Sequence, residues 1–509
     1  LVAGRAGAKV LVLEQTPHLG GRAPVDGGEI DGQSAEDWIN SAAQELENLE
    51  NVTVRTRTMG AGVYDHGYVL GYERLTDHAP KSQGPRHRLW RIRAGHVVTA
   101  TGAIERPLSF AGNDIPGVML ASAVRDYVVN YAVSAGDRTV VVTNNDDAYR
   151  TALVLKEAGL SVPAIIDART GGEDSPLMAA AKSQGIRVLT GHGIAKVKGG
   201  KRVTGVAICA QAGEGAVLEE IACEAVAMSG GWSPVVHLWS HCGGKLTWDD
   251  AQAHFKPDPD RAPIGHDGTA FVSAAGSAAG PLTLDAVLEN AQAAGAAAAA
   301  ATGHSAPASE APKAAVEAET PMAPVWLTPQ GAKVQLRSKT WLDFQNDVKV
   351  SDVQLAAQEG FESVEHAKRY TTLGMATDQG KTSNINGLAV LADRLGTDIP
   401  SVGTTTFRPP YTPISMGAIG GEARGDVFQP IRRTPMHDWH DANGAEWEPV
   451  GHWRRPYAFK RAGESTHDAV MREVKNTREA LGLLDASTLG KLVVKGPDAG
   501  KFLDMMYTN

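Results

Sequence analysis

The sequence predicts an α/β fold with two parallel-sheet units, followed by a short helical segment and the start of a further domain. Three observations lead to this prediction. Continuous apolar runs of strand length recur at residues 8–14, 139–143 and 270–276, as is typical of strands buried in a parallel sheet. Segments of helical length separate these runs. Beyond residue 303 the composition changes and the alternation stops.

The first unit opens with the apolar run at 8–14, which is expected to form a strand that ends at Glu14. A helix is expected from Ser34, because Asp37 lies three residues further on and completes a capping box. A strand is expected at 52–56, followed by hairpin-like alternation through 63–72 and by a strand pair at 87–103 that ends in a glycine turn.

A second βαβ unit is expected at about residues 136–235, inserted into the first. Its first loop, TNNDDAYRTA (143–152), has Asn144–Asp147 where a nucleotide-binding loop has glycines. These side chains would crowd a pyrophosphate, and the carboxylates would repel it. We predict that this unit binds no nucleotide. Its expected strands are 139–143, 162–167, 186–190, 203–210 and 225–228, and its expected helices are 147–158 and 177–184.

The rest of the chain is divided by its composition. A strand at 270–276 and a helix at 284–301 close the two-unit module, and an Ala-, Pro-, Glu- and Ser-rich stretch after it is expected to be an extended linker. The predicted boundaries are 1–302 for the module, 303–329 for the linker, 330–428 for a small helical domain and 429–509 for a further domain. In the last of these, a helix is expected at 466–481, a strand at 491–494 and a helix from 497.

Composition argues against several kinds of partner. The formal net charge is −9, which disfavours nucleic acid and anionic membranes. No apolar run approaches about 18 residues, so no membrane span is expected. The three cysteines, Cys209, Cys223 and Cys242, form no CxxC pair, which disfavours a disulfide framework or a metal site and indicates a cytoplasmic protein. Because the chain begins at Leu1 and stops within an expected domain, we expect a fragment of a longer subunit.

A dinucleotide site is predicted in the first unit. A Rossmann unit holds a pyrophosphate at a helix N-terminus and a ribose on an acid at the end of the second strand, and Glu14 ends such a strand. The glycine-rich loop itself would lie before Leu1. The alternative is a degenerate, empty domain.

Three motifs in this unit resemble the signatures of two-dinucleotide-binding-domain flavoproteins. Gly20-Gly21 follows Glu14 with the spacing of that family's E-x(5)-G-G, Ala100–Gly102 matches its A-T-G turn, and residues 270–277 match its third signature. Ser277 stands where that family has the Asp that binds the flavin ribityl chain, so the resemblance implies NAD rather than FAD. The candidate cofactor-binding residues are Glu14, Gln15, Gly20, Gly21, Arg22, Gly60, Thr101, Gly102, Gly276, Ser277, Leu282 and Thr283.

A second candidate site lies in residues 368–421, where cations, hydroxyls and glycines gather. Glycines at 380 and 403 let backbone N–H groups approach an anion, and the pattern indicates a surface that holds the phosphate of a nucleotide cofactor. The alternative is a solvated basic turn packed by prolines. The residues proposed to face the cofactor are Arg369, Lys381, Thr404, Thr405, Thr406 and Arg408.

Residues 335–396 resemble the small domain that holds a two-iron, two-sulfur cluster in bacterioferritin-associated ferredoxins. Here DFQNDV (343–348) occupies the place of the first cysteine pair, and Asp378 and Ser383 fall at the second. A cluster requires thiolates, so no metal is expected in this domain.

The C-terminal stretch resembles the aminomethyltransferase fold of the glycine cleavage T-protein. The resemblance rests on residues 432–459, on the G-L-x-D-x-S motif within 473–491 and on 495–509. It implies tetrahydrofolate as a ligand. The acid that contacts folate is expected beyond Asn509, so this chain alone is expected to bind folate poorly.

Over nearly its whole length the sequence resembles the α subunits of heterotetrameric sarcosine oxidases. That resemblance implies oxidative demethylation of sarcosine to glycine, with formaldehyde or 5,10-methylenetetrahydrofolate and hydrogen peroxide as further products. It implies a flavin-bearing β subunit and two small subunits as partners, with FMN at the contact with the β subunit. No catalytic residue is expected in this chain. The alternatives are a subunit of an N-methylglutamate dehydrogenase, and a non-catalytic assembly scaffold.

Overall fold

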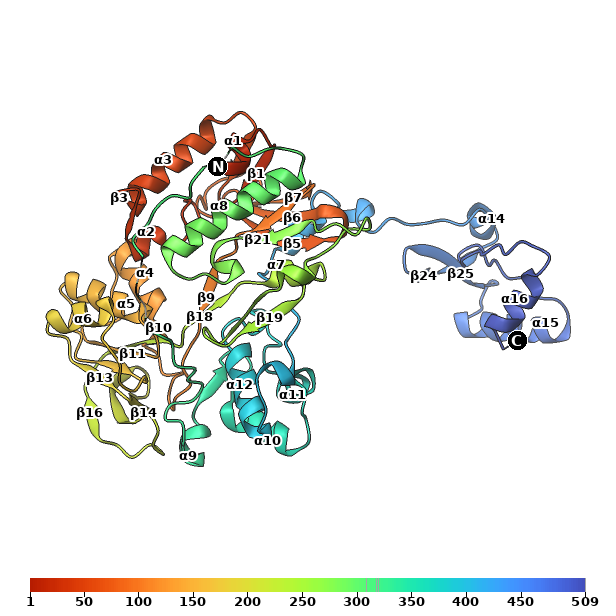
Figure 1. The fold of residues 1–509 in the computed structure, drawn as a ribbon. Helices are drawn as coiled ribbons and strands as arrows, with labels where there is room; N and C mark the ends of the chain where they lie inside the picture. The colour runs from red at the N-terminus through yellow and green to blue at the C-terminus, as the bar shows by residue number, and fades with distance from the viewer. Residues whose placement is uncertain (308, 317, 319, 509) are drawn as a thin grey trace. The chain divides into compact units, whose positions relative to one another are not determined.

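The computed structural model describes residues 1–307, 309–316, 318 and 320–508. The chain forms two compact units, Leu1–Ser415 and Met416–Asn509, and each is described by itself. The predicted α/β class is confirmed, because the first unit contains parallel strands together with the helices that connect and cover them (Figure 1).

The first dinucleotide unit is built on two parallel strand pairs. β1 (Val10–Leu13) pairs with β4 (Val52–Arg55), and α3 (Ala35–Asn48) connects them. Ser34 begins α3 as predicted, since its Oγ accepts a hydrogen bond from the Asp37 N–H at 3.1 Å. β8 (Val97–Thr99) pairs with β21 (Val272–Ala274), and α8 (Leu284–Ala301) packs against both (Figure 1).

The remaining elements of this unit flank those pairs. An antiparallel sheet forms from β5 (Thr58–Tyr64), β6 (Tyr68–Arg74) and β7 (His87–Arg93). The others are α1 (Val2–Arg5), α2 (Ala23–Asp26), β2 (Glu29–Ile30), β3 (Gln33–Ser34), β9 (Ala103–Glu105), β18 (Trp232–Pro234), α7 (His237–His241), β19 (Leu246–Asp249) and β20 (His254–Pro257).

The second βαβ unit has a parallel sheet in the order β10-β17-β11-β12-β13. Its central strand is buried on both faces. Val140 and Val142 pack with the antiparallel strands β14 and β15, whereas Val141 packs with helix α5. The run TVVVT is therefore apolar throughout. The bounds are β10 (Val118–Leu120), α4 (Ala121–Tyr131), β11 (Thr139–Thr143), α5 (Asp147–Glu157), β12 (Ile165–Asp167), α6 (Pro176–Ser183), β13 (Val188–Thr190), β14 (His192–Gly199), β15 (Val203–Ala210), β16 (Glu219–Ile221) and β17 (Ala225–Ser229).

The described residues of the predicted linker, 303–329, contain no helix or strand, but they are held against the first unit. The Lys313 N–H donates to Asp31 Oδ1 at 2.8 Å, and Ile30 and Ala314 form an isolated antiparallel bridge. Further along, the Thr328 N–H donates to the Ser109 carbonyl at 2.9 Å. Backbone hydrogen bonds therefore hold the described part of this linker against the preceding residues of the chain.

The small helical segment has its own apolar core. Val350, Val353, Leu388 and Leu391 are almost fully buried there. Helix α12 (Asn384–Leu395) is capped by Gly396, whose φ of 67° is the left-handed conformation that favours glycine. The bounds are α9 (Val334–Arg337), β22 (Trp341–Asp343), β23 (Val348–Lys349), α10 (Val350–Gln358), α11 (Val364–Thr371) and α12 (Asn384–Leu395).

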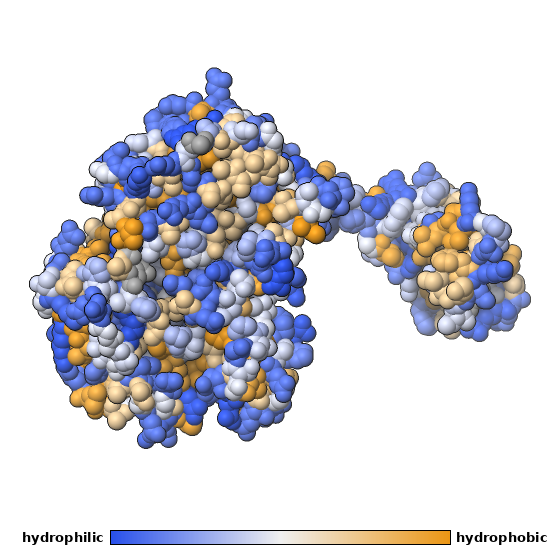
Figure 2. Space-filling view, viewed as in Figure 1, coloured by the Kyte–Doolittle hydropathy of each residue, from blue (hydrophilic) through white to orange (hydrophobic). Residues whose placement is uncertain are grey.

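The unit Met416–Asn509 contains α13 (Met416–Gly420), α14 (His437–Ala442), the hairpin β24 (Ala445–Val450) and β25 (Trp453–Phe459), α15 (Thr466–Glu479) and α16 (Ala499–Met506). α15 lies within the predicted helix, and α16 begins two residues after the predicted start. The predicted strand at 491–494 is wrong. These residues are coil, because no strand of the described chain pairs with them, and Leu492 is 91% exposed. Figure 2 shows apolar residues at the surface of this unit.

None of the helices in the described part of the chain combines the length and the apolar character that crossing a bilayer requires.

Candidate functional site

Glu14 lies at the carboxyl end of β1, with its backbone and one carboxylate oxygen fixed. Its N–H donates to the Arg55 carbonyl, and its carbonyl accepts from the Thr58 N–H at 2.7 Å. Its Oε1 accepts from the Thr16 N–H at 2.7 Å and from Thr16 Oγ1 at 2.8 Å. Within the described residues Oε2 has no bonded partner, so this oxygen is the one that could accept from a ribose hydroxyl. The following residue, Gln15, is exposed, and its carbonyl accepts from Arg74.

In the Gly20-Gly21-Arg22 turn, the structure requires glycine at the first position. Gly20 has φ 108°, and a Cβ there would lie 2.6 Å from the Ile39 side chain. Gly21 also has a left-handed φ of 58°. Arg22 pairs with Asp26 at 2.9 Å and Asp126 at 3.2 Å, and its guanidinium lies 5.3 Å from the ring centroid of Trp232. Arg22 thus connects this turn to α4 and to β18.

The turns after β8 and β21 lie at one sheet edge, because these strands are parallel neighbours. Thr101 Oγ1 donates to the Val235 carbonyl, and Gly102 has φ 73°. Gly276 has φ 62°, and its N–H donates to Asn290 Oδ1 at 2.8 Å. The other predicted residues of this group are Ser277 in the turn Gly276–Ala279, Leu282 before α8, Thr283 as the N-cap of α8, and Gly60 in β5, where a Cβ would lie 3.1 Å from Leu238.

Part of the predicted phosphate-holding surface is joined by one side chain, Gln379. Its Nε2 donates to the Arg408 carbonyl at 2.8 Å and to the Pro410 carbonyl at 3.1 Å, and its Oε1 accepts from the Arg408 N–H at 2.8 Å. Lys381, two residues later, contacts Thr412 Oγ1 at 3.4 Å. The segments that carry Lys381 and Arg408 are therefore adjacent. Of the three threonines that precede Arg408 in the sequence, Thr405 is buried, whereas Thr404 and Thr406 are exposed.

The Lys381 ammonium lies over the first of two stacked aromatic rings. Its Nζ lies 4.3 Å from the ring centroid of Tyr411, and Tyr411 stacks on His237 of α7 with centroids 3.9 Å apart and planes 13° apart. Burial lowers the pKa of Lys381 and lowers that of His237 to about 3, with His241 and Lys381 adding to the effect on His237. His237 is therefore neutral at physiological pH. Its Nδ1 is buried, with no hydrogen-bond partner among the described residues.

Arg369 lies on another element of the small domain. It is in the last turn of α11, with its side chain 69% exposed, and pairs with Glu365 at 3.8 Å. The structure thus joins Lys381 and Arg408 through Gln379 and Thr412, while Arg369 is held only by its own helix in the described contacts.

The positions that match the ferredoxin cysteines carry hydrogen-bonding side chains. The buried Asp343 carboxylate accepts from the N–H groups of Gln345 at 2.9 Å, Asn346 at 3.0 Å and Gly374 at 2.7 Å. Asp378 Oδ1 accepts from the Gly380 N–H at 3.0 Å. Hydrogen bonds therefore join the segments at these positions. Among the described residues, no group of three or more His, Cys, Asp or Glu side chains could hold a metal ion.

The unit Met416–Asn509 has a buried polar cluster that the sequence analysis did not identify. Asp485 Oδ2 lies 2.9 Å from His440 Nε2 and accepts from Thr434 Oγ1 at 2.9 Å. Hydrogen bonds, first that with Ser487, hold the pKa of Asp485 well below its usual range. The Asp of the G-L-x-D-x-S motif was the available signal, because it is this Asp485.

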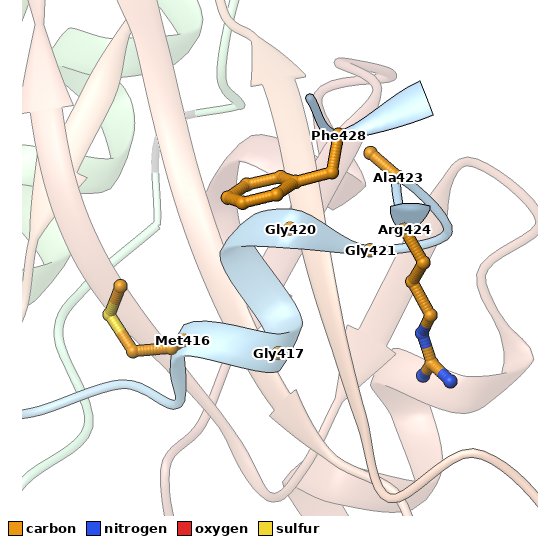
Figure 3. Close-up of a pocket in the computed structure, with 7 residues that line it drawn as sticks. All are labelled: Met416, Gly417, Gly420, Gly421, Ala423, Arg424 and Phe428. Carbon is orange, nitrogen blue, oxygen red and sulfur yellow. The ribbon is translucent and has the colours of Figure 1, made fainter. Parts of the chain in front are cut away.

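A shallow hollow of about 230 Å³ lies in the same unit (Figure 3). The Met416 and Phe428 side chains flank a helical turn whose glycines form part of the lining, and Arg424 extends away from both. With no convergent polar groups, it is a weak candidate for a binding site.

Comparisons with known proteins cover the whole chain. Residues 337–423 match the family described as sarcosine oxidase A3 domain, and residues 436–509 match the GCVT N-terminal domain. The chain is 42% identical over 518 aligned residues to sarcosine oxidase subunit alpha of Corynebacterium sp. strain P-1 and 41% identical to that of Rhizobium meliloti strain 1021. These alignments cover 100% of this chain but 52% and 50% of the two relatives, so the chain spans about half their length.

A solved structure supports the fold. The crystal structure of L-proline dehydrogenase from P. horikoshii aligns with a TM-score of 0.60 and 20% identity, over 82% of this chain and 77% of that one. This similarity is evidence for the fold alone. The sequence similarity goes further: along its whole length this chain is similar to sarcosine oxidase α subunits, about half of whose length it spans.

Proposed function

We propose that this chain is part of the α subunit of a sarcosine oxidase complex, in which it binds NAD and forms one wall of a flavin site shared with a β subunit. The observation that carries the proposal is whole-chain identity of 41–42% to sarcosine oxidase α subunits, in a chain that also clusters Lys381, Tyr411 and His237. The proposed reaction is oxidative demethylation of sarcosine.

The residues of the first unit fit NAD. Glu14 Oε2 is available for the ribose hydroxyls, and its negative charge disfavours a nucleotide with a 2′-phosphate. Thr101–Gly102 and Gly276–Ser277 provide turns at one sheet edge where backbone can approach the cofactor closely. Ser277 in place of a carboxylate is compatible with NAD, which has no ribityl chain.

The residues around Lys381 fit the phosphate of FMN. A half-buried ammonium on an aromatic face retains an electrostatic attraction to a dianion that bulk water screens less than at an open surface. Arg408 and the hydroxyls of Thr404 and Thr405 are the further candidate donors. When bound, FMN would carry electrons toward oxygen. This chain's contribution would be to hold and orient the phosphate end.

We propose a flavin-bearing β subunit and two small subunits as partners, forming a heterotetramer. The match of residues 436–509 to the GCVT N-terminal domain supports tetrahydrofolate as a ligand of the complete α subunit. A cytoplasmic location is supported by three free cysteines, Cys209, Cys223 and Cys242.

Cofactor analysis of the purified complex tests the proposal. The α subunit containing this chain is produced with its β partner, and NAD and FMN are released by denaturation and counted per complex. We expect one NAD and one FMN, and Lys381→Met should reduce FMN to less than about a third, since removing a charged contact costs roughly 1.5–3 kcal/mol. Lys201→Met, an exposed lysine between β14 and β15, is the control. Absence of both cofactors would favour an assembly scaffold.

A substrate panel distinguishes the enzymes. We expect oxygen uptake and hydrogen peroxide release with sarcosine. Turnover of N-methylglutamate without oxygen uptake would instead indicate an N-methylglutamate dehydrogenase.

A further inference from the structure

The second βαβ unit has a nucleotide-binding topology, but its own side chains use its anion-binding groups. In such a unit a nucleotide would lie at the N-terminus of α5 and beyond the end of β12. At α5, the Asp147 N–H donates to Asn145 Oδ1 at 3.1 Å, and the Asn145 N–H donates to Thr143 Oγ1 at 3.1 Å. These two amides are therefore unavailable to a phosphate.

The basic group at the end of β12 is also neutralised. Arg169 is 9% exposed, and its guanidinium pairs with Asp167 at 2.7 Å and with Asp146 at 2.8 Å. These two carboxylates raise its pKa above the ordinary value. An arginine held by two carboxylates has little charge left to attract a phosphate.

A distant segment of the same chain fills the space in front of these groups. The Thr320 N–H donates to Asp146 Oδ2 at 2.7 Å, and Thr320 Oγ1 lies 3.0 Å from the same oxygen. Arg169 Nη1 donates to Thr320 Oγ1 at 2.6 Å. Thr320 thus connects the acid at the N-cap of α5 to the arginine after β12, across 174 residues of sequence.

The contact continues past Thr320. Asn144 Nδ2 donates to the Ala323 carbonyl at 2.6 Å, and the Ala323 N–H donates to the Asn144 carbonyl at 3.2 Å. Arg106, which is 2% exposed, lies 3.0 Å from the Met322 sulfur. Asn144 is 1% exposed, so this pairing lies inside the protein.

We propose that the carboxyl edge of the second βαβ unit is a binding surface for the chain's own residues Thr320–Ala323, here called the strap. The strap takes the place of a second nucleotide. It also fastens the start of the small helical domain to this unit, since Thr328 and Gln330 continue the contact through the Ser109 and Gln211 carbonyls at 2.9 Å each. This inference does not depend on the proposed function, because it concerns a different unit from the NAD and FMN sites.

Limited proteolysis of the full chain tests the strap, with cleavage sites between residues 314 and 324 identified by mass spectrometry. Thr320→Val keeps the side-chain shape and removes the hydroxyl that joins Asp146 to Arg169. We expect initial cleavage in this region to be about tenfold faster in the variant, because cleavage requires local release of the segment. Thr397→Val, an exposed threonine outside the strap, should cleave like the parent.

A second variant and an experiment with added nucleotide complete the test. Asp146→Asn weakens the same contacts from the other side and should also accelerate cleavage, whereas NADPH added to the parent should leave the cleavage rate unchanged. Equal rates in the parent and Thr320→Val would overturn the strap, since this substitution keeps the side-chain shape and removes only the hydroxyl. Faster cleavage of the parent with NADPH would overturn it too, because a nucleotide would then displace the segment.

Discussion

The side-chain amide of Gln379 pairs with both backbone groups of Arg408, accepting from its N–H and donating to its carbonyl at 2.8 Å each. This arrangement resembles one rung of an antiparallel ladder formed by a side chain. Gln379 has a left-handed φ of 53°, and its amide also donates to the Pro410 carbonyl at 3.1 Å. One residue therefore sets the relative position of the two segments that carry Lys381 and Arg408.

Gln379→Leu is expected to lower the free energy of unfolding by about 2–3 kcal/mol, because three hydrogen bonds worth roughly 1 kcal/mol each are lost. The purified complex should also retain less FMN. Urea unfolding and flavin release measure the two effects. Gln358→Leu, at the exposed end of α10, is the matched control and should change neither. Normal stability and FMN content in Gln379→Leu would show that the Arg408–Pro410 turn keeps its conformation without Gln379.

Glu14→Gln is expected to weaken NAD binding about tenfold. The amide oxygen can still accept from Thr16, but the charge that strengthens the bond to ribose is lost, at a cost of roughly 1.4 kcal/mol. Calorimetric titration of the cofactor-free complex with NAD measures the change. Glu36→Gln, in the exposed first turn of α3, should bind like the parent. Unchanged affinity in Glu14→Gln would place the ribose elsewhere.

Glu105 gives a pH-dependent prediction. It is 2% exposed, and burial, followed by the charge of Asp147, raises its pKa to about 7. A carboxyl whose pKa is higher in the folded state costs stability as pH rises, from the unfolded value of 4.5 up to about 7, by on the order of 3 kcal/mol. Glu105→Gln, which avoids ionisation, should therefore gain stability relative to the parent between pH 5 and pH 8.

Urea midpoints at pH 5, 6, 7 and 8 measure this gain. Exposed Glu289→Gln is the control and should follow the parent at each pH. A constant difference between Glu105→Gln and the parent across the range would mean that Glu105 is ionised throughout.

Arg125→Met is expected to destabilise the protein by about 3 kcal/mol. Arg125 is fully buried and pairs with Asp26 at 2.8 Å and Asp147 at 3.1 Å, so its removal leaves two carboxylates without that partner. Arg187→Met breaks an exposed pair with Glu219 and should leave the urea midpoint unchanged. Similar midpoints for both variants would argue that water enters the Arg125 cluster.

Local patterns predicted most elements of the first 302 residues. Runs such as TVVVT are apolar throughout because both faces of β11 are covered, and the Ser34–Asp37 cap marked the start of α3. The strand predicted at 491–494 failed because strand formation depends on a partner that the local sequence does not reveal. The hairpin β24–β25 was missed, since Pro449 and Pro456 within it weaken a strand pattern.

The candidate sites were predictable only in part. Glu14 and Lys381 carry motif signals in their own neighbourhoods. His237 has none, because its stacking on Tyr411 joins residues 174 positions apart through tertiary structure. Gln379 lies next to Asp378, one of the positions that match the ferredoxin cysteines, but that resemblance concerns cluster ligands and carries no signal for a hydrogen bond to Arg408.

The contacts made by Lys313, Thr320, Ala323, Thr328 and Gln330 bear on how this polypeptide should be divided for expression. The linker-like composition of this stretch suggests a domain boundary there. A fragment ending at residue 302 would, however, lack Thr320, the partner of Asp146 and Arg169, and Ala323, the partner of Asn144. The side chains of Asp146, Arg169 and Asn144 would then lose these hydrogen bonds. A truncation placed after Gln330 would keep the βαβ pieces intact and is the better boundary for a recombinant fragment.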